Sequence, residues 1–351
     1  MEIRTIDWVN GRIKIIDQTA LPHELRYIYI DNVRDLFEAI KIMRVRGAPA
    51  LGVAAALGVF LALKNSRAKS FAVFLDELDK AASYLWSSRP TAVNLFWGLK
   101  RMRDSALGNR KKPISDIKSA ILKQALDIMQ EDMRICRSIG ECGSSLIKHG
   151  DRILTICNAG ALATVDYGTA LGVIYAAQAK NKRPKVYACE TRPLLQGSRL
   201  TAWELKRKGV DATLICDGTA ASLMAQGKID KVITGADRIA RNGDAANKIG
   251  TYALAILAHY HRIPFYVAAP LSSFDLRLVT GEDIPIEQRD KSEVANLLGN
   301  KIAPAGVKVF NPAFDVTPHR FISAIITEKG IISRPFKNNI GRLIELAGPS
   351  S

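Results

Sequence analysis

The stretch RILTICNAGALATVDYGTALG, residues 152–172, decides the expected fold. An apolar, β-branched run, ILTIC (153–157), leads into a glycine-broken turn and then into small residues of helical character. A strand, a turn and a helix in this order begin a parallel β–α–β unit. Cys157 stands where the strand ends, and ligands bind outside this edge in open α/β sheets. We therefore expect the chemistry of the protein at this edge.

The remainder of the chain repeats the pattern of strand and helix. The expected strands are ILTIC (153–157), KVYAC (185–189), ATLIC (212–216), KVITGAD (231–237) and PFYVAA (264–269), with VKVF (307–310) and GIIS (330–333) as further candidates. The helical segments between them include Thr164–Ala179, Leu200–Lys208 and Ala246–His261. Such alternation predicts an α/β fold with a doubly wound, mainly parallel sheet.

The first part of the chain has a different pattern. Two β-rich runs flank Asn10-Gly11, the strongest short signal for a hairpin. Helical patterns follow at Val33–Met43, Pro49–Leu63, Phe71–Trp86 and Ala92–Ala106. We predict an N-terminal helical domain with a small antiparallel sheet over residues 1–113, a connecting helix over 114–150, and a C-terminal domain over 151–351.

Composition excludes several classes of protein. The 351 residues carry a formal charge of +16, but the basic clusters contain no interleaved aromatic residues, so we expect no nucleic-acid partner. The longest apolar run, 48–63, is too short to span a membrane and is expected to be a buried helix. The five cysteines have no metal-binding or disulfide spacing, which favours a reducing cytoplasm and no metal site.

Several strand ends carry candidate catalytic groups. Cys157, Cys189 and Cys216 each end a strand, and position alone does not choose among them. Asp237 follows the fourth strand, where a carboxyl group could act as an acid or base or could simply form a turn. Asp244 has more the character of a loop residue.

Further along, Asn247 and Lys248 are expected to begin the next helix, where they could hold substrate hydroxyls. Two arginines precede other predicted helices: Arg46, followed by Gly47, and Arg89. An arginine at a helix start favours a phosphate, although a basic loop is the alternative. No G-x-G-x-x-G arrangement follows the first strand, so the fingerprint of a nicotinamide site is missing.

Seven long motifs together resemble one family, the methylthioribose-1-phosphate isomerases. This family shares a superfamily with the regulatory subunits of translation initiation factor 2B and with ribose-1,5-bisphosphate isomerases. The motifs are RGAPALG (46–52), SRPTAVNLFW (88–97), CNAGALATVDYGTALGVI (157–174), ETRPLLQGSRLTAWEL (190–205), GADRIARNGDAANKIGTY (235–252), IPFYVAAPLSSFD (263–275) and NPAFDVTP (311–318). The resemblance extends from about Arg46 to Lys329.

The resemblance implies conversion of S-methyl-5-thioribose 1-phosphate to S-methyl-5-thioribulose 1-phosphate in methionine salvage, with no metal or redox cofactor. It implies that Cys157 and Asp237 are the catalytic pair. It also implies a helical N-terminal domain, a Rossmann-like C-terminal domain and a cytoplasmic homodimer. The substrate-binding positions carried over are Arg46, Gly47, Ala48, Arg89, Gln196, Asn247 and Lys248.

Two departures and two alternatives accompany this resemblance. Ile156 and Cys189 stand where the family commonly has histidine and aspartate, which makes the expected pocket more apolar. A ribose-1,5-bisphosphate isomerase would need a second anion site for the 5-phosphate. A non-catalytic regulatory subunit like those of initiation factor 2B would have no need to keep Cys157 and Asp237 together.

Overall fold

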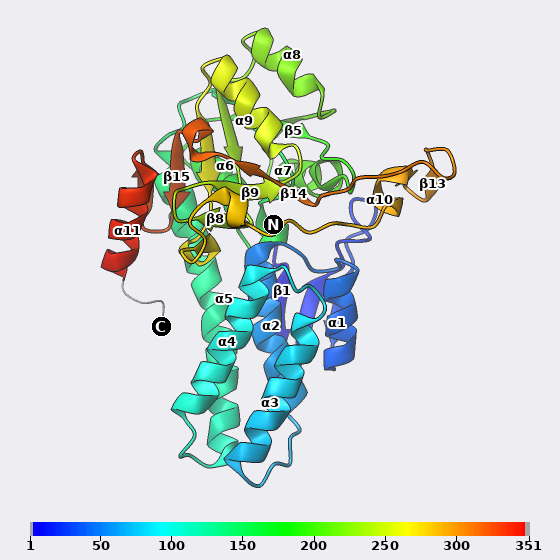
Figure 1. Cartoon of the computed structure of the whole chain (residues 1–351), viewed down its shortest axis with the longest axis vertical. Coiled ribbons are helices and arrows are strands. Elements are labelled where there is room, and N and C mark those ends of the chain that lie inside the picture. The colour runs from blue at the N-terminus through cyan, green and yellow to red at the C-terminus, as the bar shows by residue number, and fades with distance from the viewer. Residues whose placement is uncertain (1–2, 348–351) are drawn as a thin grey trace. The chain divides into compact units, whose positions relative to one another are not determined.

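The computed structural model describes residues 3–347 and forms two compact units (Figure 1). Unit 1 comprises Met1–Arg137 and Gly160–Gly168, and unit 2 comprises Ser138–Ala159 and Thr169–Ser351. The protein has the expected mixed α/β fold, with a mainly helical N-terminal region, a small antiparallel sheet and a large, mostly parallel sheet.

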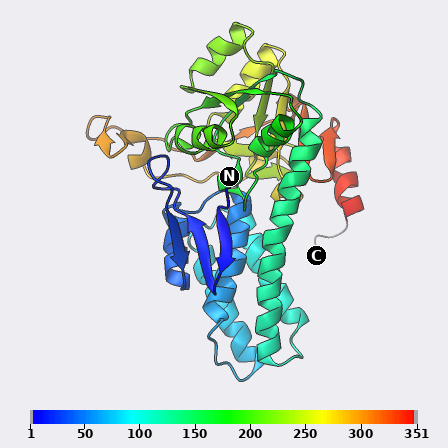
Figure 2. The same ribbon diagram turned by 180° about the vertical axis from the view of Figure 1, so that it is seen from behind.

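Unit 1 begins with a three-stranded antiparallel sheet, drawn in dark blue in Figure 2. Its strands are β1 (Ile6–Val9), β2 (Arg12–Ile16) and β3 (Tyr27–Ile30). Asn10 and Gly11 both have positive φ, at 50° and 76°, as a two-residue hairpin turn that matches the strand twist requires. The predicted hairpin is therefore confirmed.

Five helices complete unit 1: α1 (Val33–Lys41), α2 (Ala48–Leu63), α3 (Phe71–Trp86), α4 (Val93–Gly108) and α5 (Ile114–Ser144), the last of which continues beyond the unit. Helix α2 is buried over almost its whole length, as expected. It packs closely on α4, because a Cβ at Gly98 would lie 2.3 Å from the Gly52 carbonyl oxygen. No helix within residues 3–347 is long and apolar enough to cross a membrane.

Unit 2 is built on a seven-stranded sheet with the order β16-β15-β10-β7-β4-β5-β6. All neighbouring strands are parallel except β16. Numbered along the chain, the six parallel strands have the order 3-2-1-4-5-6 of a doubly wound fold, and the order reverses between β4 and β7. The strands are β4 (Arg152–Thr155), β5 (Lys185–Cys189), β6 (Asp211–Ile215), β7 (Lys231–Thr234), β10 (Phe265–Ala268), β15 (Ala324–Thr327) and β16 (Gly330–Ser333).

Unit 2 also contains six α-helices among its described residues, and two smaller sheets extend it. The helices are α6 (Ala170–Ala179), α7 (Ala202–Arg207), α8 (Thr219–Ala225), α9 (Thr251–Tyr260), α10 (Ser292–Ala295) and α11 (Phe336–Ala347). A four-stranded sheet has the order β11-β8-β9-β14, from β8 (Arg238–Ala240), β9 (Ala245–Lys248), β11 (Phe274–Asp275) and β14 (Phe314–Thr317). The strands β12 (Asn296–Leu297) and β13 (Asn300–Lys301) form a hairpin.

The helix predicted over Ala246–His261 was wrong in its first part. Asn247 and Lys248 lie on β9, which pairs with β8 on one side and β14 on the other. Gly250, with φ of 100°, then turns the chain, and only Thr251–Tyr260 is helical. The run AANKI contains no strong strand former before its last residue, so only tertiary pairing makes it a strand.

The other corrections concern where elements begin. Helix α6 starts at Ala170 and not at Thr164, because Gly160–Gly168 forms a loop with one 3₁₀ turn, Ala161–Ala163. Residues 307–310 are not a strand and are largely exposed, whereas 330–333 is one, as predicted. The strand β15 was not anticipated.

Candidate active site

The two candidate catalytic residues follow the two strands at which the sheet order reverses. Cys157 comes two residues after β4, and Asp237 comes three residues after β7. The loops after these strands are packed together, because a Cβ at Gly235 would lie 2.8 Å from the Cβ of Ala159. A reversal of strand order leaves a crevice at the carboxyl edge, and this is where doubly wound folds bind ligands.

Cys157 has an unusual backbone. Its φ is 65°, which is the left-handed region that side-chain-bearing residues rarely adopt. Its N–H donates to Thr191 Oγ1 at 2.8 Å, and its carbonyl oxygen accepts from Thr201 Oγ1 at 2.6 Å. The residue is half-buried. The helix expected directly after it does not exist, since α6 begins at residue 170, so a helix N-terminus adjacent to the thiol cannot account for its chemistry.

Asp237 lies in the turn between β7 and β8, and its backbone N–H donates to the Ala246 carbonyl oxygen at 2.9 Å. The nearby Asp244 has a structural role. Its carboxylate accepts the backbone N–H groups of Gly281 and His319, at 2.9 and 2.7 Å, and thereby joins three loops. This agrees with its assignment as a loop residue and leaves Asp237 as the acid/base candidate of the segment.

Asn247 and Lys248 are presented by strand β9. Asn247 is buried and donates to Thr251 Oγ1 at 3.0 Å, and Thr251 in turn donates to the Lys248 carbonyl oxygen. Asp315 accepts the N–H groups of Gly250 and Tyr252 at the start of α9. Burial raises the pKa of Asp315 to about 6. The strand and the helix start therefore hold each other in place.

Gln196 carries a buried oxygen that has no hydrogen-bond partner among residues 3–347. The residue is 5% exposed, and its Oε1 is the atom without a donor. Buried polar groups are normally paired, so an unpaired one calls for an explanation. A ligand hydroxyl could supply the missing donor. The π-helical turn Gly197–Thr201 follows directly, and such turns occur often at functional sites.

The remaining candidates, Arg46, Gly47, Ala48 and Arg89, belong to unit 1. Arg46 is only 7% exposed, and its Nε donates to Gln18 Oε1 at 3.1 Å. Gly47 caps helix α2 with φ of 95°, and Ala48 is the first helical residue. A Cβ at Gly47 would lie 2.5 Å from Ala163, so no other residue fits there without movement. A buried arginine before free helical N–H groups is suited to an anion.

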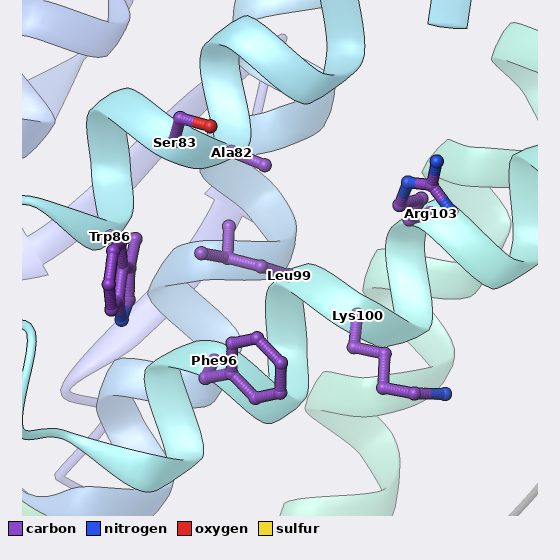
Figure 3. Close-up of a pocket in the computed structure, with 7 residues that line it drawn as sticks. All are labelled: Ala82, Ser83, Trp86, Phe96, Leu99, Lys100 and Arg103. Atoms are coloured by element: carbon purple, nitrogen blue, oxygen red, sulfur yellow. The ribbon is translucent and has the colours of Figure 1, made fainter.

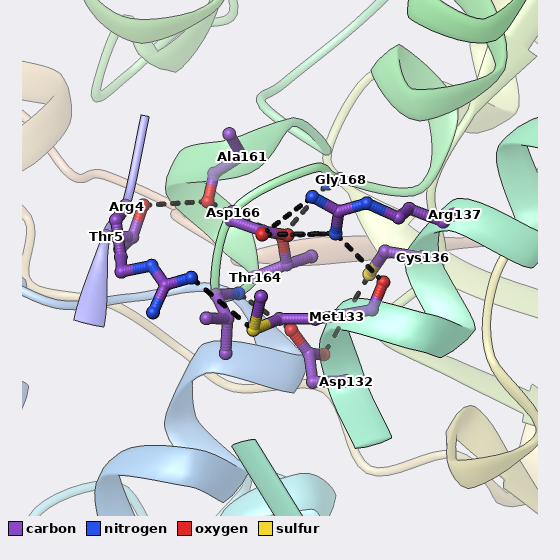
Figure 4. A network of polar contacts seen from close by, with 11 residues as sticks. Arg4, Thr5, Asp132, Met133, Cys136, Arg137, Ala161, Thr164, Asp166 and Gly168 are labelled. Carbon is purple, nitrogen blue, oxygen red and sulfur yellow. Dashed lines mark hydrogen bonds and ion pairs between the residues drawn. The ribbon is translucent and has the colours of Figure 1, made fainter. Parts of the chain in front are cut away.

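The segment Gly160–Gly168 is held within unit 1 by a polar network (Figure 4). Asp132 accepts the Val165 N–H at 2.7 Å, and Arg137 forms a bidentate pair with Asp166 at 2.9–3.1 Å. Sequence reasoning missed these residues, and likewise Thr191, Thr201 and Gln18. The only available signal was that Thr191 and Thr201 lie inside the motif after the second strand, and nothing in the spacing indicated their partners.

A pocket of about 230 Å³ lies elsewhere in unit 1, between α3 and α4 (Figure 3). Trp86, Phe96 and Leu99 line it, with Lys100 and Arg103 beside them. These two cations form ion pairs with Asp104 and Asp79, and the walls are almost entirely apolar. The chemistry does not suit a phosphorylated sugar, so we place the candidate active site at the sheet edge.

Comparison with known proteins gives concordant matches. The model of the initiation factor 2 subunit family matches residues 44–334. A 5-deoxyribose 1-phosphate isomerase from Moorella thermoacetica is 55% identical over 99% of both chains. The structure of 5-methylthioribose 1-phosphate isomerase from Pyrococcus horikoshii has a TM-score of 0.91 and 46% identity, covering 98% of this chain and 96% of that one. The structure of translation initiation factor eIF-2B, subunit delta, from A. fulgidus has a TM-score of 0.87 and 47% identity, covering 98% and 99%.

Proposed function

We propose that this chain, which belongs to the initiation factor 2 subunit family, is an aldose–ketose isomerase acting on a 5-modified ribose 1-phosphate. The preferred substrate is S-methyl-5-thioribose 1-phosphate, and the product is S-methyl-5-thioribulose 1-phosphate. The observation that carries this proposal is the position of Cys157 and Asp237. They follow the two strands on either side of the reversal, in loops that pack together.

The reaction needs a group that gives a proton to the ring oxygen and takes one from the C2 hydroxyl. The anomeric phosphate locks the sugar as a furanose, so the ring must open before C2 can become a carbonyl. We assign Asp237 as the acid that protonates the ring oxygen while its bond to C1 breaks. Asp237 then accepts the proton of the C2 hydroxyl as the ketone forms, which restores its starting state. Each well-placed proton transfer contributes about 10²–10⁴-fold to the rate.

The hydrogen on C2 must move to C1, and two routes are possible. In the enediol route the Cys157 thiolate removes a proton from C2, and the thiol returns a proton to C1. In the hydride route the hydrogen moves with its electron pair directly from C2 to C1, and Cys157 only shields the reaction. Turnover in D₂O separates the routes, since deuterium enters C1 only where an exchangeable proton is used.

The binding roles follow the resemblance and the local chemistry of each residue. We assign the phosphate to Arg46, with Gly47 and Ala48 providing helix-start N–H groups, and to Arg89. The buried Oε1 of Gln196 is assigned to accept a hydrogen bond from a sugar hydroxyl. Asn247 and Lys248 are assigned to the remaining hydroxyls.

The substituent at C5 defines the exact substrate. One relative is named for 5-deoxyribose 1-phosphate and another for 5-methylthioribose 1-phosphate, and these sugars differ only in whether C5 carries a methylthio group. Ribose 1,5-bisphosphate would instead place a dianion at C5. Ile156 and Cys189, both buried and apolar, favour an uncharged substituent.

The test compares turnover of these three sugars by the wild type, Cys157→Ser and Asp237→Asn. Cys216→Ser is the matched control, because Cys216 is an exposed cysteine at another strand end. We expect turnover of the methylthio sugar to fall at least about 100-fold in Asp237→Asn on either route, and by a similar factor in Cys157→Ser on the enediol route, and to be unchanged in the control. Folding of each variant is checked by circular dichroism. If the folded wild type converts none of the sugars, the proposal is wrong.

A second candidate function is a regulatory subunit that acts by protein contact. It is favoured by the 47% identity to a structure named as an initiation factor subunit. Capture of an initiation factor together with absence of turnover would support it. We also expect a cytoplasmic homodimer, as the resemblance implies. Light scattering of the purified chain tests the dimer.

A further inference from the structure

We propose that Thr191 and Thr201 are positioning residues that hold Cys157 in its left-handed backbone conformation, and that the reactivity of this thiol depends on them. The inference rests on the proposed function, because it assumes that Cys157 takes part in the chemistry. A side-chain-bearing residue in the left-handed region is strained, and it persists only where its surroundings impose it. Two buried threonine hydroxyls contact the two peptide units that flank Cys157.

Thr191 fixes the peptide unit before Cys157. Its Oγ1 donates to the Cys189 carbonyl oxygen at 3.0 Å, and a hydroxyl has only one proton to donate. The oxygen is therefore oriented to accept the Cys157 N–H at 2.8 Å. Thr191 itself has φ of 67°, and its own N–H donates to Asp217 at 2.8 Å. Cys157 is thus held by Thr191, whose own left-handed backbone is held by Asp217.

Thr201 fixes the peptide unit after Cys157. Its Oγ1 donates to the Cys157 carbonyl oxygen at 2.6 Å and accepts from Asn158 Nδ2 at 3.2 Å. Asn158 is held in turn by the buried Glu204, at 2.8 Å. Cys157, Asn158, Thr201 and Glu204 all belong to unit 2. The hydroxyl of Thr201 therefore has a defined direction, toward Cys157.

The π-helical turn explains why Thr201 reaches this position. Thr201 is the last residue of the turn Gly197–Thr201. The first residue, Gly197, packs directly on the end of β5, since a Cβ there would lie 1.6 Å from the Cys189 carbonyl oxygen and 2.9 Å from Thr191 Oγ1. The turn and the strand end therefore meet at Thr191. Both hydroxyls that contact Cys157 are set by this one close approach.

The experiment compares Thr→Val, which keeps the shape and removes the hydroxyl, with Thr→Ser, which keeps the hydroxyl. Thr201→Val and Thr201→Ser are the first pair, and Thr191→Val and Thr191→Ser are the second. Thr213→Val is the matched control, because Thr213 is exposed on β6. Two readouts are measured: kcat and KM for the methylthio sugar, and the rate of alkylation of Cys157 by iodoacetamide between pH 6 and 9. Mass spectrometry gives this rate relative to that of the exposed Cys216 in the same sample.

We expect Thr201→Val to lower kcat about tenfold or more with KM within about threefold, as the loss of an oriented hydrogen bond predicts. The ratio of Cys157 to Cys216 alkylation should change by a similar factor, and Thr201→Ser should restore both. A folded Thr201→Val whose kcat and alkylation ratio match the wild type overturns the proposal, as does a serine variant as impaired as the valine one. If Thr201→Val does not fold, the comparison of Thr191→Val with Thr191→Ser tests the proposal by the same criteria.

The alkylation ratio also separates this proposal from the proposed function. It requires no substrate, so it reports how the backbone presents Cys157 even if the wild type converts no sugar. A changed ratio in an inactive protein would support the positioning role and contradict the isomerase. Normal turnover with an unchanged ratio in both valine variants would support the isomerase and contradict the positioning role.

Discussion

Asp132 is a buried carboxyl group whose ionisation should make the stability of the protein depend on pH. It lies on α5, is 8% exposed and accepts the Val165 N–H at 2.7 Å (Figure 4). Burial, with a smaller contribution from the negative charge of Asp166, raises the pKa of Asp132 from 3.8 to about 7. The Cys136 thiol, 3.9 Å from its other oxygen, is also buried and offers little compensation.

The sign of the effect follows from proton linkage. The folded state binds the Asp132 proton more tightly than the unfolded state does, so the free energy of unfolding decreases as the pH rises between 3.8 and about 7. The loss levels off about one pH unit above the folded-state pKa of about 7. At about 1.4 kcal/mol for each pH unit, the total loss is about 4 kcal/mol, of which about 2–3 kcal/mol falls between pH 5 and pH 8.

Asp132→Asn removes this ionisation while keeping an oxygen that can accept the Val165 N–H. We expect the variant to be more stable than the wild type at pH 8. The difference in free energy of unfolding, variant minus wild type, should be about 2–3 kcal/mol larger at pH 8 than at pH 5. Urea unfolding followed by tryptophan fluorescence measures the difference, because Trp8, Trp86 and Trp97 all lie in unit 1.

The control is Asp127→Asn on the same helix, where the carboxylate is exposed and pairs with Lys123. Exposed pairs of this kind contribute about 0–1 kcal/mol, so its difference from the wild type should vary little with pH over this range. A stability difference between Asp132→Asn and the wild type that is the same at pH 5 and pH 8 would refute the reasoning. So would a variant that is less stable at pH 8, because the buried charge would then be favourable.

Two further predictions concern close backbone approaches. Gly98→Ala should destabilise the protein by about 1–3 kcal/mol, because its Cβ would lie 2.3 Å from the Gly52 carbonyl oxygen. The control is Gly108→Ala on the same helix. Its Cβ would meet nothing within 4 Å, so this variant should be neutral or more stable by up to about 1 kcal/mol. Thermal unfolding of the two variants side by side measures this contrast, and equal effects would contradict it. Gly197→Ala should lower turnover at least about tenfold, because a Cβ cannot fit 1.6 Å from the Cys189 carbonyl oxygen without moving the π-helical turn; an alanine variant with unchanged kcat would contradict this.

The sequence predicted best those elements whose local pattern and tertiary role agree. The hairpin at Asn10-Gly11 and the buried helix α2 were both expected, because turn chemistry and apolar content are properties of the residues themselves. The parallel strands β4, β5, β6, β7 and β10 were expected for the same reason. The runs of β4, β7 and β10 are largely buried, as is typical of strands inside a parallel sheet, whereas β6 lies at the edge and is mostly exposed.

The prediction failed where pairing with distant segments decides the structure. Strand β9 exists because β14, some 70 residues later, pairs with it in the register Lys248↔Phe314. Local propensity is a weak guide in such a case. The start of α6 was misplaced because the segment Gly160–Gly168 is fixed by contacts in unit 1, and Asp132 and Arg137, which make them, are remote in the sequence.

The three cysteines at strand ends illustrate what the fold adds to the sequence. Cys189 is fully buried, and burial together with the charge of Asp217 raises its pKa to about 12, which makes a thiolate inaccessible at neutral pH. Cys216 is exposed beyond β6, the edge strand of the sheet, which is two strands away from the reversal of strand order. Cys157 alone of the three follows β4, beside the reversal of strand order, and is half-buried on a constrained backbone. Strand ends could be located from the sequence, but only the order of the strands distinguishes the end at which a ligand can bind.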